Sequence, residues 1–82
     1  MIKMQARIYV YGFLKNIVPS RFRHHPAALE FDSPITVHKV LTVILGLKIP
    51  DSTVLVSGKI VNAGYAVQDG DEIHIFPPIA GG

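Results

Sequence analysis

Two segments near the ends of the chain alternate between apolar and other residues, which is the pattern of a half-buried strand. Residues 5–11 and residues 72–76 both show it, and both are rich in β-branched and aromatic side chains. One face of each segment is apolar at every position, so we expect this face to point into a core. The residues predicted to face the core are Ala6, Ile8, Val10, Ile73 and Ile75.

The hydrophobic period changes to that of a helix in the middle of the chain. Apolar residues recur at the spacing i, i+3, i+4, i+7 and i+8 from Val37 to Leu45, which predicts one main helix. Thr36 can cap its first turn, whereas Gly46 and Pro50 favour an end shortly after the stripe. Because apolar residues outnumber polar ones here, we expect most of the circumference of this helix to be covered.

Three further short segments have the composition of strands: residues 27–32, 53–57 and 60–62. Residues 13–26 are expected to be irregular, apart from one helical turn at 13–18. The order is therefore β-β-α-β-β-β, which predicts an α+β fold with a mixed four- to five-stranded sheet packed on one helix. Because the first and last strands are strongly apolar on one face, we expect them to pair in the middle of the sheet.

The composition is that of a small globular domain. The chain has 82 residues, of which 49% are hydrophobic and 17% charged, so we expect residues 1–82 to form one domain. There is no cysteine, which excludes a disulfide framework, a thiolate metal site and a cysteine nucleophile. No apolar run approaches the roughly 20 residues of a membrane span, and no signal-peptide pattern is present. We therefore expect a cytoplasmic protein without a membrane partner.

The charge pattern does not predict a metal site or a nucleic-acid partner. The net charge is +2, and the basic residues are scattered except for a cluster at residues 21–25, which we interpret as a solvated loop. No nucleic-acid-binding motif accompanies this cluster. The histidines and carboxylates are not spaced to share a metal ion, and turn chemistry accounts for Asp69 and Asp71.

The last strand leads directly into the sequence Pro77, Pro78, Ile79, Ala80, Gly81 and Gly82. Glycine has no Cβ, so a Gly-Gly end can pass through a narrow channel and leaves its carboxylate unshielded. We interpret residues 77–82 as a flexible tail that is stiffened at its base by the two prolines. The carboxylate of Gly82 is the candidate reactive group, and residues 77–81 would serve passage of the tail. A chance pair of glycines is the simpler alternative.

The two strong strands also present a candidate surface for partner docking. If they pair in parallel, one group of residues shares the face away from the core: Arg7, Tyr9, Tyr11, His74 and Phe76. Arginine and aromatic residues are enriched in the centres of protein interfaces. We therefore interpret this face as a docking surface, with scattered surface aromatics as the alternative.

Four stretches carry a resemblance to a known family. They are Ile-Thr-Val at 35–37, Val-Leu-Val-Ser-Gly-Lys-Ile-Val at 54–61, Val-Gln-Asp-Gly-Asp-Glu-Ile at 67–73 and Phe-Pro-Pro-Ile-Ala-Gly-Gly at 76–82. Together they resemble the MoaD/ThiS-like family of ubiquitin-like β-grasp sulfur carriers, over nearly the whole chain. The Phe-Pro-Pro stem is most similar to the small subunit of molybdopterin synthase, whereas the segment 13–26 lacks the charged helix expected of that branch.

The resemblance implies a carrier without catalytic machinery or a bound cofactor of its own. A partner adenylating enzyme of the ubiquitin-activating type would use ATP to activate Gly82, which then becomes a thiocarboxylate. A sulfur-accepting enzyme, such as the large subunit of molybdopterin synthase, would receive the sulfur, and this chain would be the small subunit of that enzyme. Two alternatives stay open: a ubiquitin-like modifier conjugated through Gly82, and a β-grasp interaction module without terminal chemistry.

Overall fold

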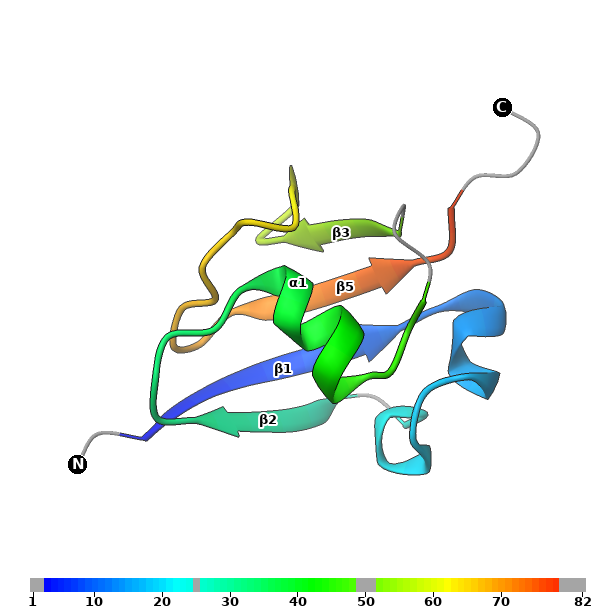
Figure 1. Cartoon of the computed structure of the whole chain (residues 1–82), viewed down its shortest axis with the longest axis horizontal. Coiled ribbons are helices and arrows are strands. Elements are labelled where there is room, and N and C mark those ends of the chain that lie inside the picture. Colours follow the sequence, from blue (N-terminus) through cyan, green and yellow to red (C-terminus); the bar gives the residue numbers. More distant parts are fainter. Residues whose placement is uncertain (1–2, 25, 49–51, 79–82) are drawn as a thin grey trace.

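The computed structural model describes residues 3–24, 26–48 and 52–78, and within them five strands form one sheet that packs on a single short helix (Figure 1). The strands lie in the order β2-β1-β5-β3-β4. This confirms the predicted β-β-α-β-β-β succession and the β-grasp arrangement. The strands are β1 Met4–Val10, β2 Ala27–Phe31, β3 Thr53–Val56, β4 Lys59–Val61 and β5 Glu72–Phe76.

The first and last strands are the central pair of the sheet, as predicted. β1 and β5 run in parallel, with Ile8 opposite Ile73 and Val10 opposite Ile75. The other neighbouring strands are antiparallel. The two strands that are most apolar on one face therefore lie where a sheet is covered most completely.

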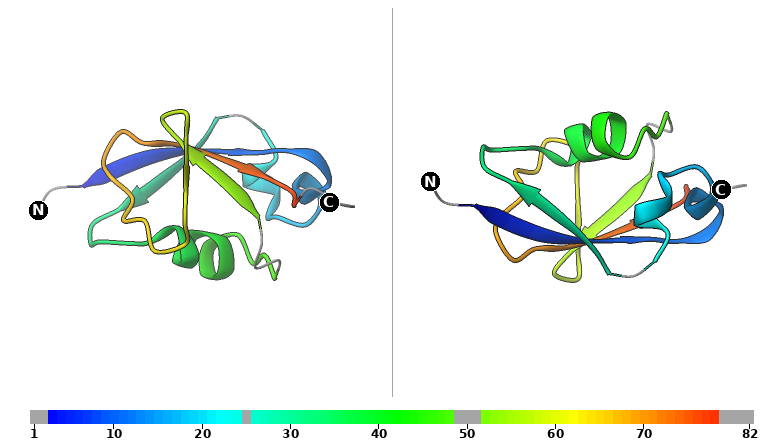
Figure 2. Two further views of the ribbon diagram at one scale, coloured as in Figure 1. Left: turned by 90° about the horizontal axis from the view of Figure 1, so that it is seen from above. Right: turned by 90° about the horizontal axis from the view of Figure 1, so that it is seen from below.

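The core lies between one face of the sheet and the helix. All five strand residues predicted to face the core are buried, as are Val54 and Val56 of β3. From the other side the core is closed by Val37, Val40 and Leu41. Figure 2 shows the helix on one side of the sheet, and in the described part of the chain no helix covers the opposite face.

The helix begins as predicted but is unusual in its second half. It consists of α1, Val37–Lys39, and a π-type turn, η3, Val40–Ile44. Thr36 Oγ1 accepts a hydrogen bond from the backbone N–H of Lys39 at 3.3 Å, so this residue is the N-cap. Beyond the last turn Gly46 has a φ of +68°, the left-handed conformation that commonly ends a helix.

The expectation that most of the helix circumference is covered was wrong. Val43 is 70% exposed, and His38, Lys39 and Thr42 are exposed as well. The physical reason is geometric: a single helix on a sheet can bury only the stripe that faces the sheet, whatever the composition of its outer side.

The loop between β4 and β5 completes the start of the helix. The backbone N–H groups of Val37 and His38 donate to the carbonyl oxygens of Tyr65 and Ala63, both at 2.9 Å. These N–H groups have no partner within the helix itself, so a segment distant in sequence satisfies them.

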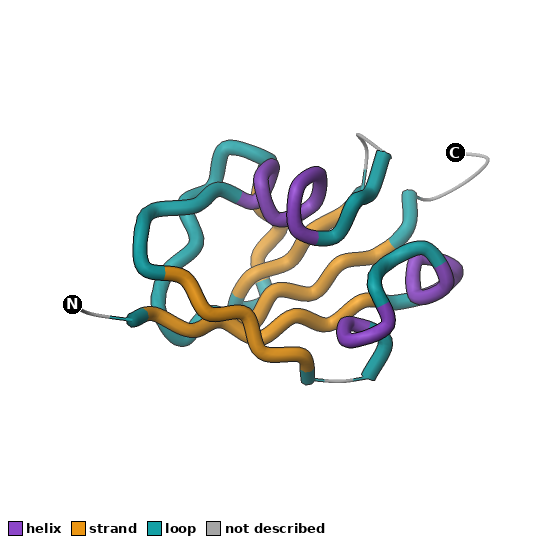
Figure 3. The backbone as a smooth tube through the Cα atoms, turned by 60° about the horizontal axis from the view of Figure 1, so that its bottom comes forward, coloured by secondary structure: helices purple, strands orange, loops and turns teal. Residues whose placement is uncertain are grey.

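The segment after β1 contains two short 3-10 turns, where one helical turn in an irregular region was predicted. They are η1, Gly12–Asn16, and η2, Ser20–Phe22, and they lie beyond the end of β1 (Figure 3). Leu14, Val18 and Phe22 point inward and are buried. The segment therefore closes one end of the core. Within the described residues, no helix is long and apolar enough to cross a membrane.

Candidate functional site

The structure describes the base of the tail but not its end. Gly82, Gly81, Ala80 and Ile79 lie outside the described residues. Pro77 and Pro78 are described and half-buried, and they continue directly from β5. The chain leaves the sheet at the end where the turn η1 lies (Figure 1).

The base of the tail rests against the end of β1. The ladder between β1 and β5 extends beyond the strand itself, because the N–H of Tyr11 donates to the carbonyl of Ile75 at 3.0 Å. The rings of Tyr11 and Phe76 stack with centroids 4.4 Å apart and planes 5° apart. The next residues, Gly12 and Pro77, are also in close contact, since a Cβ on Gly12 would lie 2.9 Å from Cγ of Pro77.

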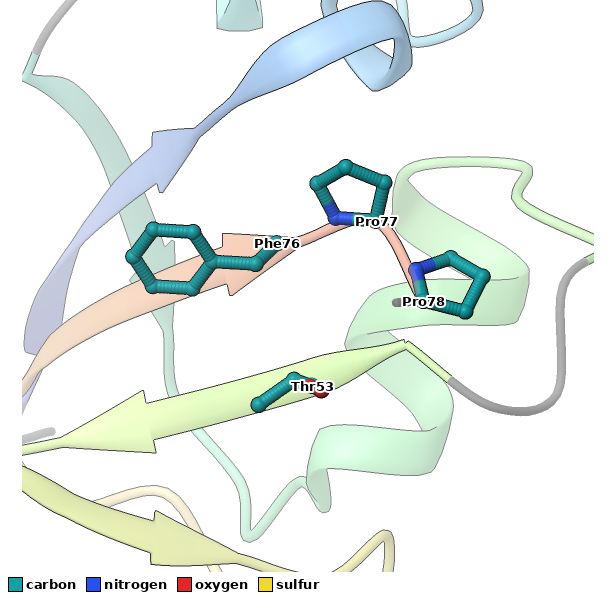
Figure 4. A pocket seen from close by; sticks show the side chains of 4 residues that line it. All are labelled: Thr53, Phe76, Pro77 and Pro78. Atoms are coloured by element: carbon teal, nitrogen blue, oxygen red, sulfur yellow. The ribbon is translucent and has the colours of Figure 1, made fainter. Parts of the chain in front are cut away.

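A shallow apolar pocket opens beside this stem. It has a volume of about 410 Å³ and is lined by Thr53, Phe76, Pro77 and Pro78 (Figure 4). Thr53 is the register partner of Phe76 on the neighbouring strand β3. The tail therefore starts between the end of β1 on one side and the start of β3 on the other.

The structure brings the five predicted docking residues together on the helix-free face. Tyr9 stacks on His74 with centroids 4.4 Å apart, and the hydroxyl of Tyr11 lies 2.8 Å from Nδ1 of the same ring. Phe76 continues this stack through Tyr11. At the other end of the group Arg7 Nη2 is paired with Glu72 Oε2 at 2.7 Å.

Two apolar residues that the sequence reasoning did not single out extend this face. Leu55 of β3 is the register partner of His74, and Ile60 of β4 is the register partner of Leu55. Ile60 is 76% exposed. The alternation that identified Tyr9 and Phe76 could have found both residues, had it been continued into the weaker strands. From here on, the docking face means Arg7, Tyr9, Tyr11, Leu55, Ile60, His74 and Phe76.

The acidic residues near the start of β5 hold a turn. Asp71 Oδ2 accepts hydrogen bonds from the hydroxyl of Tyr65 at 2.9 Å and from the N–H of Gln68 at 2.8 Å. Partial burial, and then the neighbouring Asp71 carboxylate, raise the pKa of Tyr65 above its usual value of 10.0. Asp69 Oδ1 accepts from the N–H of Gln5 at 2.8 Å.

The basic cluster has the exposure expected of a solvated loop. Arg21, Arg23 and His24 are exposed, while His25 lies outside the described residues. The guanidinium of Arg21 lies over the ring of the buried Phe22, 4.4 Å from its centroid. In the described ranges 3–24, 26–48 and 52–78, no three acidic, histidine or cysteine residues gather in a group that could hold a metal ion.

Three solved structures have the same β-grasp fold. The Haloferax volcanii HVO 2177 protein is 21% identical, with a TM-score of 0.71, and the match covers 98% of this chain and 88% of that one. Small archaeal modifier protein 1 of H. volcanii is 19% identical, with a TM-score of 0.63 and 93% and 99% covered. A Pyrococcus furiosus protein described provisionally as molybdopterin converting factor subunit 1 is 15% identical, with a TM-score of 0.63 and the same coverage. At these identities the likeness shows the fold alone.

The sequence itself identifies the family. None of the curated proteins matches the chain significantly. The profile of the ThiS family, in contrast, matches residues 9–82, from β1 through the tail. Because this match spans most of the chain, the protein belongs to the ThiS family.

Proposed function

We propose that this protein is a sulfur carrier for cofactor biosynthesis whose reactive group is the carboxylate of Gly82. The observation that carries the proposal is the family match, which runs through the tail to Gly82. The fold supports it, because β5 leads from the middle of the sheet directly into Pro77 and Pro78. The tail would thus extend from a well-supported strand.

The proposed reaction makes the chain the substrate of a partner enzyme. An oxygen of the Gly82 carboxylate attacks the α-phosphorus of ATP, pyrophosphate leaves, and an acyl-adenylate forms. A hydrosulfide equivalent then attacks the carbonyl carbon, AMP leaves with the bonding electron pair, and a thiocarboxylate remains. The sequence lacks the Gly-rich loop with a following lysine that would cradle the phosphates of ATP, so the partner would supply that site.

The partner we propose is an adenylating enzyme of the ubiquitin-activating type, and the docking face would bind it. This face combines stacked aromatic rings with an arginine and an exposed aliphatic residue, which is the composition found at the centres of interfaces. We further propose molybdopterin synthase as the enzyme that accepts the sulfur. The Phe76-Pro77-Pro78 stem and the structural likeness to the P. furiosus protein support this choice.

The experiment that tests the carrier function is the intact mass of the protein from its native host, with its C-terminal peptide sequenced. The expected result is replacement of one oxygen by one sulfur, localised to Gly82. An unmodified carboxylate, even after incubation with the cognate activating enzyme, ATP and a sulfur donor, would overturn the proposal.

A second candidate function is that of a ubiquitin-like protein modifier, which the structural likeness to small archaeal modifier protein 1 favours. Both functions begin with the same adenylate of Gly82, so activation alone does not separate them. An isopeptide bond between Gly82 and lysines of other proteins, detected in cell extract, would support the modifier. If deletion of Gly81 and Gly82 left every function intact, a plain interaction module would be the correct reading.

The absence of side chains at Gly81 and Gly82 predicts that substitutions there slow the loading of sulfur. Gly81→Ala or Gly82→Ala should lower the rate of loading by about 10- to 100-fold, because an added methyl group displaces the carboxylate in the channel of the partner. Thiocarboxylate formation measured by mass spectrometry checks this. Ala80→Gly, which removes a methyl group, is the control and should load normally. Normal loading of both alanine variants would remove the steric argument.

A further inference from the structure

We propose that Gly12 is a positioning residue that sets the direction of the C-terminal tail. The ring of Pro77 packs where a side chain at position 12 would lie, and this contact between Gly12 and Pro77 is called the seat below. The purpose of this positioning rests on the proposed function. The seat itself involves only described residues and can be tested without a partner.

The seat lies where β5 loses its neighbour. The last β1–β5 hydrogen bond runs from the N–H of Tyr11 to the carbonyl of Ile75. At Gly12 the chain takes a φ of +65° and turns away into η1. Because this conformation strains residues with a Cβ, glycine permits the turn at this point. Beyond it, β1 no longer accompanies the chain that leads to the tail.

Packing then replaces hydrogen bonding as the restraint on the stem. Pro77 has no backbone N–H, so it cannot donate to a ladder. A Cβ built on Gly12 would lie 2.9 Å from Cγ and 3.3 Å from Cδ of Pro77, so the proline ring occupies the place of a side chain at position 12. One residue earlier, the stacked rings of Tyr11 and Phe76 hold the two segments together in the same way.

The position of this contact explains how it would matter for the tail. Residues 79–82 follow Pro78 and can extend by up to about 13 Å. A tilt at Pro77 would therefore shift the region that the carboxylate of Gly82 can reach. A stem with one direction also reduces the ordering that is needed when the tail enters the active site of a partner. The contact between Gly12 and Pro77 would affect how readily the tail enters the active site of the partner, whereas the docking face would affect the affinity for the partner.

The decisive variant is Gly12→Ala, and the chain offers a matched control. Gly46 has a nearly identical φ of +68°, and a Cβ added there meets no atom within 4 Å. Gly12→Ala and Gly46→Ala therefore impose the same backbone strain, but only the first displaces Pro77. Both should lower the melting temperature through this strain, Gly12→Ala somewhat more because of its contact with Pro77. A fold check by circular dichroism should show the same secondary structure for both.

The two variants should differ in their reaction with the activating enzyme. We expect Gly12→Ala to lower kcat/KM, measured by ATP–pyrophosphate exchange with this protein as the varied substrate, by about two- to tenfold. This loss corresponds to the free energy of ordering a loosened segment. The Kd of the complex measured without ATP should stay unchanged. Gly46→Ala should behave as the wild type in both measurements. Equal kcat/KM for the two variants, or a parallel loss of affinity in Gly12→Ala, would overturn the positioning role.

A rescue experiment separates the steric contact from backbone strain. Pro77→Ala removes Cγ and Cδ, the two atoms that a side chain at position 12 would meet. The loss of kcat/KM caused by Gly12→Ala should therefore be smaller in the Pro77→Ala background than in the wild type. An unchanged loss of kcat/KM would mean that backbone strain at Gly12, not displacement of Pro77, causes the effect.

A measurement on the isolated full-length protein keeps the seat distinguishable from the proposed function. Nuclear Overhauser effects between the α-protons of Gly12 and the ring protons of Pro77 should be present in the wild type and in Gly46→Ala. They should be absent in Gly12→Ala. Their absence in the wild type would overturn the seat. Their presence in a wild-type protein that no cognate enzyme can adenylate would leave the seat intact and overturn the proposed function.

Discussion

At the scale of single residues, the polar side chains of the loop before β5 serve the fold. The carboxylate of Asp71 binds the hydroxyl of Tyr65 and the N–H of Gln68 and so holds both ends of one turn. The carbonyl of Tyr65 accepts from the N–H of Val37 at the start of the helix. A single tyrosine thus connects the turn before β5 to the helix.

Tyr65→Phe tests this connection and carries a pH dependence. At neutral pH the variant should lose about 1 kcal/mol of stability, the usual net value of one hydrogen bond. The raised pKa of Tyr65 means that the unfolded chain releases the phenolic proton before the folded protein does. The advantage of the wild type is therefore complete below pH 10 and declines as the pH rises through the folded-state pKa.

Urea unfolding of both proteins between pH 7 and pH 11 measures this difference. The other titratable groups are common to both proteins, so their contributions cancel. Equal stabilities at neutral pH, or a difference that grows above pH 10, would contradict the assigned role of Tyr65.

At the scale of elements, the helix depends on its surroundings. α1 has three residues and η3 has five, and a helix this short is not stable in isolation. Its N-terminus is satisfied by Thr36 and by the loop at residues 63–65. At its other end the N–H of Leu45 donates to the carbonyl of Val40, five residues back, at 2.9 Å. The helix is therefore a part of the core that both ends and one face hold in place.

The cap at Thr36 predicts a specific loss of stability. Thr36→Ala removes the acceptor for the N–H of Lys39 and should cost about 1 kcal/mol. Thr42→Ala is the matched control, because this exposed threonine donates from its Oγ1 to the carbonyl of His38 within the helix. Such a bond adds little to helix stability. Thermal unfolding of both variants should show a clear decrease for the first only, and equal decreases would argue against the cap.

At the scale of the whole molecule, the two faces of the sheet differ in what they present. One face is buried under the helix, and the other carries the docking face, whose aromatic rings stack in a row from Tyr9 to Phe76. The stem of the tail continues from the end of this row. A partner that covered these rings would therefore lie next to the point where the tail begins.

Phe76→Ser tests whether this face binds the activating enzyme. We expect the Kd to rise by about tenfold or more, as for a central aromatic residue of an interface. Phe76 is half-buried. Val43→Ser is the control, because Val43 is an exposed apolar residue that lies on the helix, on the other side of the molecule. Titration calorimetry, with the fold verified by circular dichroism, should show normal affinity for this control. If both variants bind as the wild type does, docking uses another surface.

The sequence alone determined the parts of this protein that depend on local period. Alternation in residues 5–11 and 72–76 identified the core positions, and the same alternation identified the opposite face with Tyr9 and His74. The helical stripe and the cap at Thr36 were also readable, because their partners lie within four residues along the chain. The last six residues indicated a candidate reactive group, the carboxylate of Gly82, whereas the chemistry proposed for it came from the resemblance to the sulfur-carrier family.

The tertiary structure decided everything that depends on contacts between distant segments. The exposure of Val43 follows from how many layers cover the helix, which no local pattern encodes. Residues 12–22 show no hydrophobic periodicity, yet Leu14 and Phe22 are buried because this segment closes one end of the core. The contact of Gly12 with Pro77 joins residues 65 positions apart, and it exists only because β1 and β5 end side by side. Hydrophobic periodicity reports which side of one segment is buried, whereas the contact between Gly12 and Pro77 depends on how two distant segments pack together.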